Sequence, residues 1–311
     1  MKNFDPIARE LVLIGGGHSH VLVLKMLGMN PIPGLKVTLI SPDVLTPYSG
    51  MLPGVVAGHY QAEEIHIDLS PLCRFANVRF IQSKVIGIDT DNNTLLCKNW
   101  PDIEFDVLSI DIGISPSLDN IEGASSEGLP VKPIGQFLTR WTRFLDKAKK
   151  EGVDNIGVVG AGAGGVELAL AINHRLQKYL DIPPTVHLFT ADDKVLSNYS
   201  ERVRHTVLKS LTAAGIKLQA NCRVQEVRGN KLSTSSGEEF ILDEIFWVTA
   251  AASQNWLQKT DLPLNEKGFI QISETLQVQG FDHIFASGDI ANMVESPRPK
   301  AGVYAVRQGP Y

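Results

Sequence analysis

The stretch that decides the fold runs from Asn155 to Ile172 and reads NIGVVGAGAGGVELALAI. Its first part, Ile156–Val159, is a short apolar run that is long enough for a buried parallel strand. The pattern Gly160-Ala-Gly162-Ala-Gly-Gly165 follows at once, and Val166–Ile172 then predicts a helix. The three glycines allow a tight turn, close approach of backbone N–H groups to a pyrophosphate, and close packing of the helix on the strand. A strand, this turn and a helix together predict dinucleotide binding.

The composition of the chain excludes several classes of protein. The 311 residues carry a net charge of −5 and a pI near 5.9, which argues against nucleic acid or an anionic membrane as the main partner. No apolar run reaches the roughly 18 residues that a spanning helix needs, and the opening MKNFDPIARE lacks the apolar core of a signal peptide. The three cysteines imply no disulfide framework. We therefore expect a cytoplasmic protein of two domains.

A second copy of the pattern lies at the start of the chain. Glu10–Ile14 is predicted to be a strand, Gly15-Gly-Gly17-His18-Ser-His20 a turn, Val21–Leu27 a helix, and Lys36–Ile40 the next strand. This βαβ unit departs from the fingerprint at two positions. His20 stands in place of the third glycine, so the helix should sit slightly off the strand. Ser41 stands where an acidic residue normally holds a ribose, and its hydroxyl would bond the ribose less strongly.

The two histidines of this turn, His18 and His20, are more consistent with cofactor contact or packing than with a metal site. They are two residues apart and therefore lie on different faces of a helix. The following segment, Asp43–His59, has the glycine and proline content of a loop with little helix. Because it is also rich in apolar residues, we expect it to cover a flat apolar ligand rather than to lie free on the surface. Asp68 or Ser70 should cap a short helix.

The remaining pattern repeats the first. Pro133 should open a helix with an apolar stripe that ends at Gly152, and Thr185–Phe189 should form a strand that ends at Thr190, again without the usual acidic residue. A helix over Glu201–Ala214 should carry Val203, Val207, Leu208 and Leu211 on one face and end at Gly215. Short strands are predicted at the following ranges: 78–81, 84–89, 94–97, 107–110, 217–220, 224–227, 231–234 and 244–249.

Each half thus runs from strand to glycine turn, helix, strand, meander, strand and small-residue turn, and Gly15 and Gly160 are 145 residues apart. The predicted fold class is α/β, with two Rossmann-like βαβ dinucleotide-binding domains, the second inserted in the first, and antiparallel meanders. The predicted boundaries are residues 1–130 and 262–311 for an FAD-binding domain, and residues 131–261 for an NAD(P)-binding domain.

The segment from Thr275 to Asp289, TLQVQGFDHIFASGD, resembles the flavin-binding motif of the pyridine nucleotide-disulfide oxidoreductases. GGGHSH, DIGISP, GAGAGGVELA and VTAAASQNWL match further motifs of that family along the whole chain. The nearest subgroup looks like type II NADH dehydrogenases and sulfide:quinone reductases. KVTLISPDVLTPYSGMLPGVVAGHY and RPKAGVYAVRQGPY look closer still to the flavoprotein domain that is fused ahead of selenide, water dikinase in some bacteria.

This resemblance implies FAD and NAD(P)H as cofactors and assigns residues to them. Asp289 would bond the ribityl and phosphate region of FAD, Ala301–Val306 would present a helix end to the flavin, and Glu167 would lie near the nicotinamide as the catalytic residue. The cofactor-binding residues are then Gly15, Gly17, His18, His20, Ser41, Pro47, Val85, Gly113, Gly160, Gly162, Gly165, Thr190, Ala251, Gly288, Asp289, Ala301, Gly302 and Val303.

Two classes of function follow from the sequence. The first is an FAD-dependent NAD(P)H oxidoreductase that passes electrons to a quinone, a small acceptor or a fused selenium-metabolism domain. The second is a non-catalytic flavin or nucleotide sensor on the same fold. The absence of a Cys-x-x-Cys motif disfavours dithiol reductases. The family continues beyond the position of Tyr311 with a segment that covers the flavin and often mediates dimer or membrane contact. We therefore expect a truncated chain, a possible homodimer when complete, and weaker FAD binding by these 311 residues.

Overall fold

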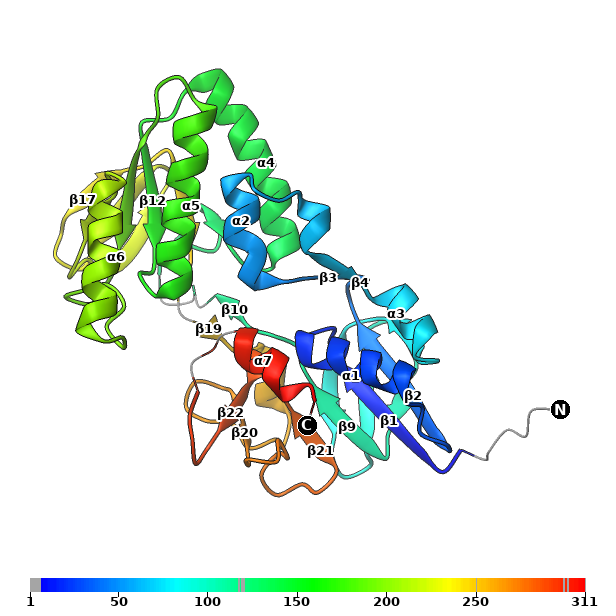
Figure 1. The fold of residues 1–311 in the computed structure, drawn as a ribbon. Helices are drawn as coiled ribbons and strands as arrows, with labels where there is room; N and C mark the ends of the chain where they lie inside the picture. Colours follow the sequence, from blue (N-terminus) through cyan, green and yellow to red (C-terminus); the bar gives the residue numbers. More distant parts are fainter. Residues whose placement is uncertain are drawn as a thin grey trace. The chain divides into compact units, whose positions relative to one another are not determined.

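The computed structural model describes residues 7–116, 118, 121–249, 251–298, 300 and 302–310, without the side chains of Ser115, Pro116 and Ala251. The chain divides into two compact units (Figure 1). Unit 1 comprises Met1–Tyr48, His66–Ser115 and Ala252–Tyr311, and unit 2 comprises Ser49–Ile65 and Pro116–Ala251.

Unit 1 is built on a five-stranded sheet in the order β21-β9-β1-β2-β5, in which all neighbours are parallel. The strands are β1 (Arg9–Ile14), β2 (Leu35–Ser41), β5 (Arg79–Gln82), β9 (Val107–Ile110) and β21 (Ile284–Ala286). Helices α1 (His18–Met29), α3 (Leu69–Phe75) and α7 (Gly302–Gln308) belong to the same unit. The near-continuous apolar strands are those of a parallel sheet that is covered on both faces. Asp68 caps α3 by accepting a hydrogen bond from the Ser70 backbone N–H at 2.9 Å, as the sequence predicts.

Unit 2 has a parallel sheet of the same design, in the order β11-β18-β12-β13-β14. Its strands are β11 (Leu129–Pro130), β12 (Asn155–Val159), β13 (Thr185–Phe189), β14 (Lys217–Gln219) and β18 (Glu244–Trp247), and its long helices are α4 (Ile134–Glu151), α5 (Ala163–Tyr179) and α6 (Glu201–Ala213). The predicted apolar stripe of α4 is buried, and Trp141 and Phe144 pack on Phe246 with ring centroids 5.7 and 5.6 Å away.

Each unit also carries an antiparallel meander. Unit 1 has β6 (Val85–Asp89), β7 (Thr94–Cys97) and β8 (Ile103–Glu104), and unit 2 has β15 (Val224–Arg228), β16 (Lys231–Thr234) and β17 (Glu239–Ile241). The predicted α/β class, with parallel sheets and a Rossmann-like topology, is confirmed, and so is the repeat of one topology along the chain.

The remaining elements are short. They are β3 (Leu45–Pro47), β4 (His66–Asp68), β10 (Ser115–Pro116), β19 (Ala251–Ala252), β20 (Ile270–Ile272), β22 (Ala291–Met293), α2 (Leu52–Ala57) and the 3₁₀ turns η1 (Ser49–Met51), η2 (Ala62–Ile65), η3 (Asn255–Lys259) and η4 (Gly288–Ile290). Within the described residues, no helix is both long enough and apolar enough to span a bilayer.

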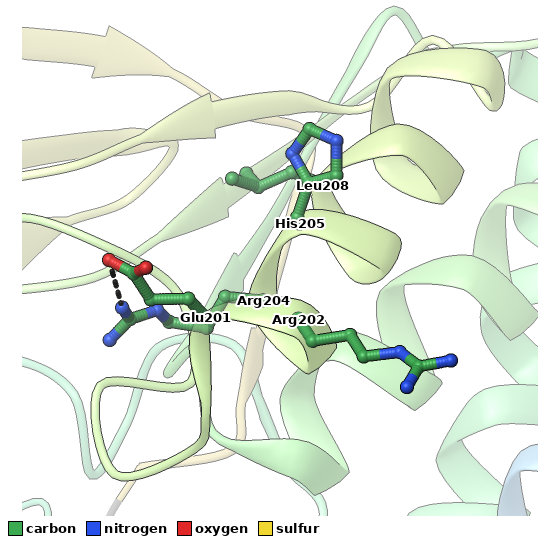
Figure 2. Close-up of a pocket in the computed structure, with 5 residues that line it drawn as sticks. All are labelled: Glu201, Arg202, Arg204, His205 and Leu208. Carbon is green, nitrogen blue, oxygen red and sulfur yellow. Dashed lines mark ion pairs between the residues drawn. The ribbon is translucent and has the colours of Figure 1, made fainter.

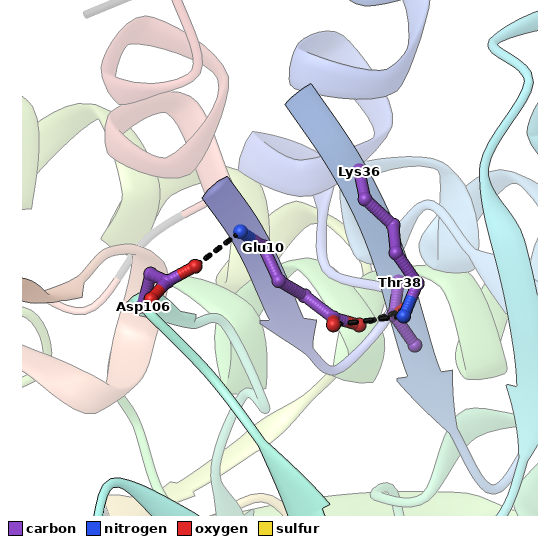
Figure 3. A network of polar contacts seen from close by, with 4 residues as sticks. All are labelled: Glu10, Lys36, Thr38 and Asp106. Carbon is purple, nitrogen blue, oxygen red and sulfur yellow. Dashed lines mark hydrogen bonds and ion pairs between the residues drawn. The ribbon is translucent and has the colours of Figure 1, made fainter. Parts of the chain in front are cut away.

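The amino ends of the strands in unit 1 are tied together by a polar network (Figure 3). The Glu10 carboxylate accepts hydrogen bonds from Lys36 Nζ at 2.8 Å and from Thr38 Oγ1 at 3.2 Å. The Glu10 backbone N–H donates to Asp106 Oδ2 at 2.6 Å, just before β9 begins. These contacts join β1 to β2 and to β9 at their amino ends, whereas the glycine turn lies at the carboxyl end of β1.

One expectation from the sequence is wrong. The segment Asp43–His59 is not a loop with little helix, because α2 forms within it and buries Leu52 and Val56 among the side chains of α4 and α5. Proline is tolerated in the first turn of a helix, and Gly58 ends the helix in the left-handed region at φ 80°. The apolar residues of α6 differ in exposure: Val203 is 40% and Leu208 is 36% accessible, Val207 is partly buried against the core, and Leu211 is buried.

Candidate functional site

The carboxyl ends of β1 and β9 define a topological switch point in unit 1. The chain runs outward from β1 to β2 and β5, and then returns to β9 on the other side of β1. In open α/β sheets, ligands bind at such a point, outside the carboxyl ends of the strands. Gly15 follows β1 and Asp111 follows β9, and the Gly17 N–H donates to the Asp111 carbonyl oxygen at 3.2 Å.

The glycines of this turn have no room for a side chain. Gly15 has φ 90°, and a Cβ built on it would lie 2.2 Å from the Asp111 carbonyl oxygen. A Cβ on Gly17 would lie 2.2 Å from Asp111 Oδ2. The backbone of the turn therefore approaches the end of β9 more closely than any other residue type allows.

Unit 2 has the same arrangement at its own switch point, between β12 and β18. Gly160 has φ 114°, and its Cβ would lie 2.4 Å from the Val248 carbonyl oxygen. A Cβ on Gly165 would lie 1.7 Å from the Gly160 carbonyl oxygen, so α5 packs directly on the turn. A Cβ on Gly162, the N-cap of α5, would meet no described atom within 4 Å. The first N–H groups of this 17-residue helix thus begin beside open space, as an anion site requires.

His20 stands at the position in unit 1 that the third glycine, Gly165, holds in unit 2. Its side chain is 1% exposed, with Nδ1 2.7 Å from the Gly15 carbonyl oxygen and Nε2 2.8 Å from Ser109 Oγ. Burial lowers the pKa of His20 to about 4, so the ring is neutral at physiological pH. His20 is therefore a packing residue that ties α1 to β1 and β9.

His18 has a different environment. Its Nε2 is buried and has no hydrogen-bond partner among the described residues, and its ring lies 4.8 Å from that of Tyr48. Burial lowers the pKa of His18, and the charge of Asp111 opposes this shift. His18 Nε2, a buried polar atom without a partner among the described residues beside the glycine turn, could hydrogen-bond a polar group of a bound ligand.

The residues that end the second strand of each unit have hydroxyl groups engaged in local turns. Ser41 is 4% exposed, and its Oγ donates to the Asp43 carbonyl oxygen at 2.9 Å. Thr190 is 8% exposed, and its Oγ1 accepts from the Asp192 backbone N–H at 3.2 Å. Each hydroxyl keeps further capacity to accept a hydrogen bond, but neither provides the charge of the usual carboxylate.

The structure brings the Gly288-Asp289 segment to the glycine turn of unit 1. The Ser287 N–H donates to the Ile110 carbonyl oxygen at 3.0 Å, which places Gly288 beyond the end of β9. A Cβ on Gly288 would lie 2.4 Å from Asp111 Oδ1. The Gly288 N–H donates to Gln308 Oε1 of α7 at 2.8 Å, so the predicted motif and the predicted helix are in contact.

Helix α7 contains two of the predicted flavin contacts, Gly302 and the 49%-exposed Val303, whereas Ala301 lies outside the described residues.

Lys300 was not predicted as a site residue. Its Nζ donates to the Ala291 carbonyl oxygen and lies 4.3 Å from the centre of the Phe269 ring. Burial lowers the pKa of Lys300 to about 8 against the raising effect of Asp289.

The other predicted residues are less closely grouped. Pro47 pairs with His66 in the β3–β4 ribbon, Val85 is 4% exposed in β6, and Gly113 has φ 65°. Ala251 lies in β19, and its side chain is outside the described part of the structure. Glu167 is exposed near the start of α5.

The glycines of the turns do not line either of two pockets among the described residues. One, of about 190 Å³, lies in unit 1 between α1, α7 and the sheet, and His20, Ser109 and Gln308 are among its lining residues. The other, of about 430 Å³, lies along α6 (Figure 2). There Glu201 pairs with Arg204 at 3.6 Å, while Arg202 points away from this ion pair.

The cysteines do not provide a reactive thiol pair. Cys73, Cys97 and Cys222 are all buried and free. Burial raises the pKa of Cys73 to about 11 and also raises the pKa of the other two thiols. Since the thiolate is the reactive form, these side chains are poor nucleophiles.

Sequence reasoning missed Asp111, which lies against Gly15, Gly17 and Gly288. Its carboxylate is 3% exposed and accepts a hydrogen bond from the Ser19 N–H at 3.0 Å. The signal was present in the sequence, because an acidic residue directly follows the strand that pairs with the fingerprint strand. In the sequence, Asp111 is the first residue of DIGISP, which has the composition of the small-residue turn that ends the first half.

Comparisons with known proteins agree with this architecture. The NADH dehydrogenase-like protein YutJ of Bacillus subtilis is 23% identical over 295 residues, covering 93% of this chain and 78% of the relative. The demethylphylloquinone reductase NdbB of Synechocystis is 25% identical over 292 residues, covering 90% of this chain and 71% of the relative. The structure of Plasmodium falciparum NDH2 in complex with NADH superposes with a TM-score of 0.81 at 19% identity, covering 91% of this chain and 64% of that one.

Residues 9–309 match the family model described as pyridine nucleotide-disulphide oxidoreductase, so the match extends over nearly the whole described chain. Both glycine turns, both sheets and the Gly288-Asp289 segment lie within it. The predicted family is thereby confirmed, whereas the fusion to a selenium enzyme remains untested. The chain belongs to the pyridine nucleotide-disulphide oxidoreductase family, whose cofactors are FAD and NAD(P)H.

Proposed function

We propose that this protein is an FAD-dependent NAD(P)H oxidoreductase, in which unit 1 binds FAD and unit 2 binds the nicotinamide nucleotide. The observation that carries this proposal is the recurrence of one arrangement at two switch points. In each unit a glycine with positive φ follows the central strand of the sheet (β1 or β12), approaches the strand across the switch point, and leads into a helix.

The residues of unit 1 fit FAD. Gly15, Gly17 and Gly288 meet at one place where a Cβ would overlap with Asp111, and the unpartnered Nε2 of His18 adds a polar group at the same turn. Asp289 lies next to Gly288 and would hold the ribityl and phosphate region, as the family resemblance implies. Bound FAD would supply the capacity to take a hydride from nicotinamide and to pass electrons to an acceptor.

The residues of unit 2 fit a nicotinamide nucleotide through Gly160, Gly162 and Gly165. The open N-terminus of α5 would bind the pyrophosphate through backbone N–H groups. Glu167 lies close to the start of this helix and is exposed, so it is free to contact the nicotinamide end of the nucleotide. Hydride transfer requires positioning rather than a protein nucleophile, which agrees with three buried, unreactive cysteines.

For the electron acceptor, we propose a quinone. The name of the Synechocystis relative specifies a quinone reductase, and the alternative NAD(P)H-ubiquinone oxidoreductases of Arabidopsis thaliana are among further relatives. The resemblance to the flavoprotein domain ahead of selenide, water dikinase makes a fused selenium-metabolism domain the second candidate. A cytoplasmic location and a homodimer stay predictions from the sequence.

The oxidoreductase and the non-catalytic sensor are separated by one experiment. The chain is saturated with FAD under anaerobic conditions and mixed rapidly with NADH or NADPH while flavin absorbance is followed. An oxidoreductase bleaches the flavin at a rate that saturates with nucleotide concentration. A sensor binds the nucleotide, as measured by calorimetry, and leaves the flavin oxidised.

A further inference from the structure

The carboxylate of Asp111 occupies the amino end of α1. Its Oδ2 accepts the Ser19 N–H at 3.0 Å, and the His20 N–H also bonds this carboxylate. These N–H groups belong to the first turn of the helix, where donors have no partner within the helix. They are the donors that the first helix of a dinucleotide-binding unit offers to a pyrophosphate. In unit 1, a side chain of the protein itself already uses them.

Unit 2 shows that this arrangement is not required by the fold. Ile14 pairs with Ile110 in unit 1, and Val159 pairs with Trp247 in unit 2, so Val248 stands where Asp111 stands. The apolar side chain of Val248 cannot accept a hydrogen bond from α5. One fold thus carries a carboxylate at the first switch point and a valine at the second.

The environment of Asp111 disfavours the ionised form of its carboxyl group. Burial raises its pKa to about 6, although the N–H groups of Ser19 and His20 and the charge of His18 favour the ionised form. Asp289 on η4 adds a like charge that raises the pKa further. Lys300 interacts with Asp289, and the neutral ring of His20 contributes no charge. At neutral pH the carboxylate is therefore held close to its titration range.

We propose that Asp111 makes FAD binding in unit 1 proton-linked: the ionised carboxylate competes with the pyrophosphate for the N-terminus of α1, and protonation of Asp111 accompanies binding. This inference rests on the proposed FAD site. A carboxylate and a pyrophosphate cannot share the same N–H donors without strong repulsion, since both are anions in a buried setting. A protonated carboxyl removes the repulsion, and its O–H provides a further donor for a phosphate oxygen.

The proposal has a measurable consequence for affinity. Above about pH 6, where the free protein has lost the proton, the FAD dissociation constant should rise by up to about tenfold for each pH unit. Below that pH it should level off. Asp111→Asn keeps the shape and an acceptor for the Ser19 N–H but carries no charge. Its dissociation constant should stay nearly flat across the range and be at least about tenfold lower than that of the wild type at about pH 8.

The test is FAD titration by flavin fluorescence from about pH 5 to about pH 9 for the wild type, Asp111→Asn and the control Asp106→Asn. Asp106 lies at the opposite end of β9 and accepts the Glu10 N–H, so its variant removes the same charge from the same strand. The control should keep the wild-type slope. Parallel slopes for the wild type and Asp111→Asn would overturn the role of Asp111 while leaving the FAD site intact. Absence of FAD binding by both at every pH would overturn the proposed FAD site itself.

A second measurement uses the wild type alone, in case Asp111→Asn does not fold. Calorimetric titration of FAD at about pH 8 in two buffers with different ionisation enthalpies reports the protons exchanged on binding. The proposal requires uptake of close to one proton. No uptake, or release, would refute it.

Discussion

Replacing Gly165 with alanine tests the claim that α5 packs directly on the nucleotide turn. The new Cβ would lie 1.7 Å from the Gly160 carbonyl oxygen, and real Cβ contacts do not fall below 3.0 Å, so one of the two must move by at least about 1.3 Å. Both atoms belong to the backbone of one turn, which has no flexible side chain to yield. Gly165→Ala should therefore destabilise the protein by about 1–3 kcal/mol.

The neighbouring residue supplies a matched control. A Cβ on Gly164 would meet Val248 Cγ1 at 3.9 Å, an ordinary van der Waals contact. Because alanine loses less conformational entropy than glycine in a helix, Gly164→Ala should stabilise α5 by about 0.5–1 kcal/mol. The two variants, each with one added methyl in the same helical turn, should then differ by about 1.5–4 kcal/mol.

Thermal unfolding monitored by circular dichroism measures this difference. For a protein of this size it corresponds to a gap in Tm of roughly 2–6 °C, with Gly165→Ala the lower. NADH titration should also show weaker binding by Gly165→Ala, because the displaced turn no longer presents its N–H groups correctly. Equal Tm values, or a more stable Gly165→Ala, would refute the close packing of α5 on Gly160.

Three further predictions concern the cofactor sites and pH. The folded-state pKa of His20, about 4, is below its ordinary value of 6.5, so its contribution to stability is complete above pH 6.5 and is lost as pH falls towards 4. Urea unfolding should show that the free energy of unfolding falls by about 3 kcal/mol over this range in the wild type but not in His20→Gln. The same dependence of this free energy on pH in both proteins would contradict the buried neutral ring. Asp289→Ala should purify without flavin, and full FAD stoichiometry by absorbance would remove Asp289 from the site. Since Thr190 provides no carboxylate and no arginine lies within the following ten residues, kcat/KM for NADH and NADPH should differ by less than about 100-fold, or roughly 2.7 kcal/mol. A larger ratio would show that other residues decide the nucleotide preference.

The elements that sequence reasoning predicted well depend on short-range patterns. The glycine turns at Gly15 and Gly160 are specified by residues within one βαβ unit, and the stripe of α4 follows the helical period. The strands on either side of each glycine turn and its helix, β1 and β2 in unit 1 and β12 and β13 in unit 2, follow from the same local signals.

What was missed depends on contacts between residues that are far apart in sequence. Helix α2 reads as a loop because of its proline and glycines, and only the apolar surface of α4 and α5 stabilises it. Asp111 reads as part of a turn, and its bond to Ser19 spans 92 positions. Val203 on α6 is an example of the opposite case: it belongs to an apolar stripe in the sequence, but it is exposed because the stripe does not itself supply a partner surface.

The most direct test of the proposed function is a single-turnover reaction of the FAD-loaded chain. Anaerobic stopped-flow mixing with NADH should bleach the flavin at a rate that rises with NADH and then saturates, and Gly165→Ala should need more NADH to reach that limit. Bleaching would show that the site on unit 1 and the site on unit 2 act together in hydride transfer. A flavin that stays oxidised in the presence of saturating NADH and of saturating NADPH would contradict the account.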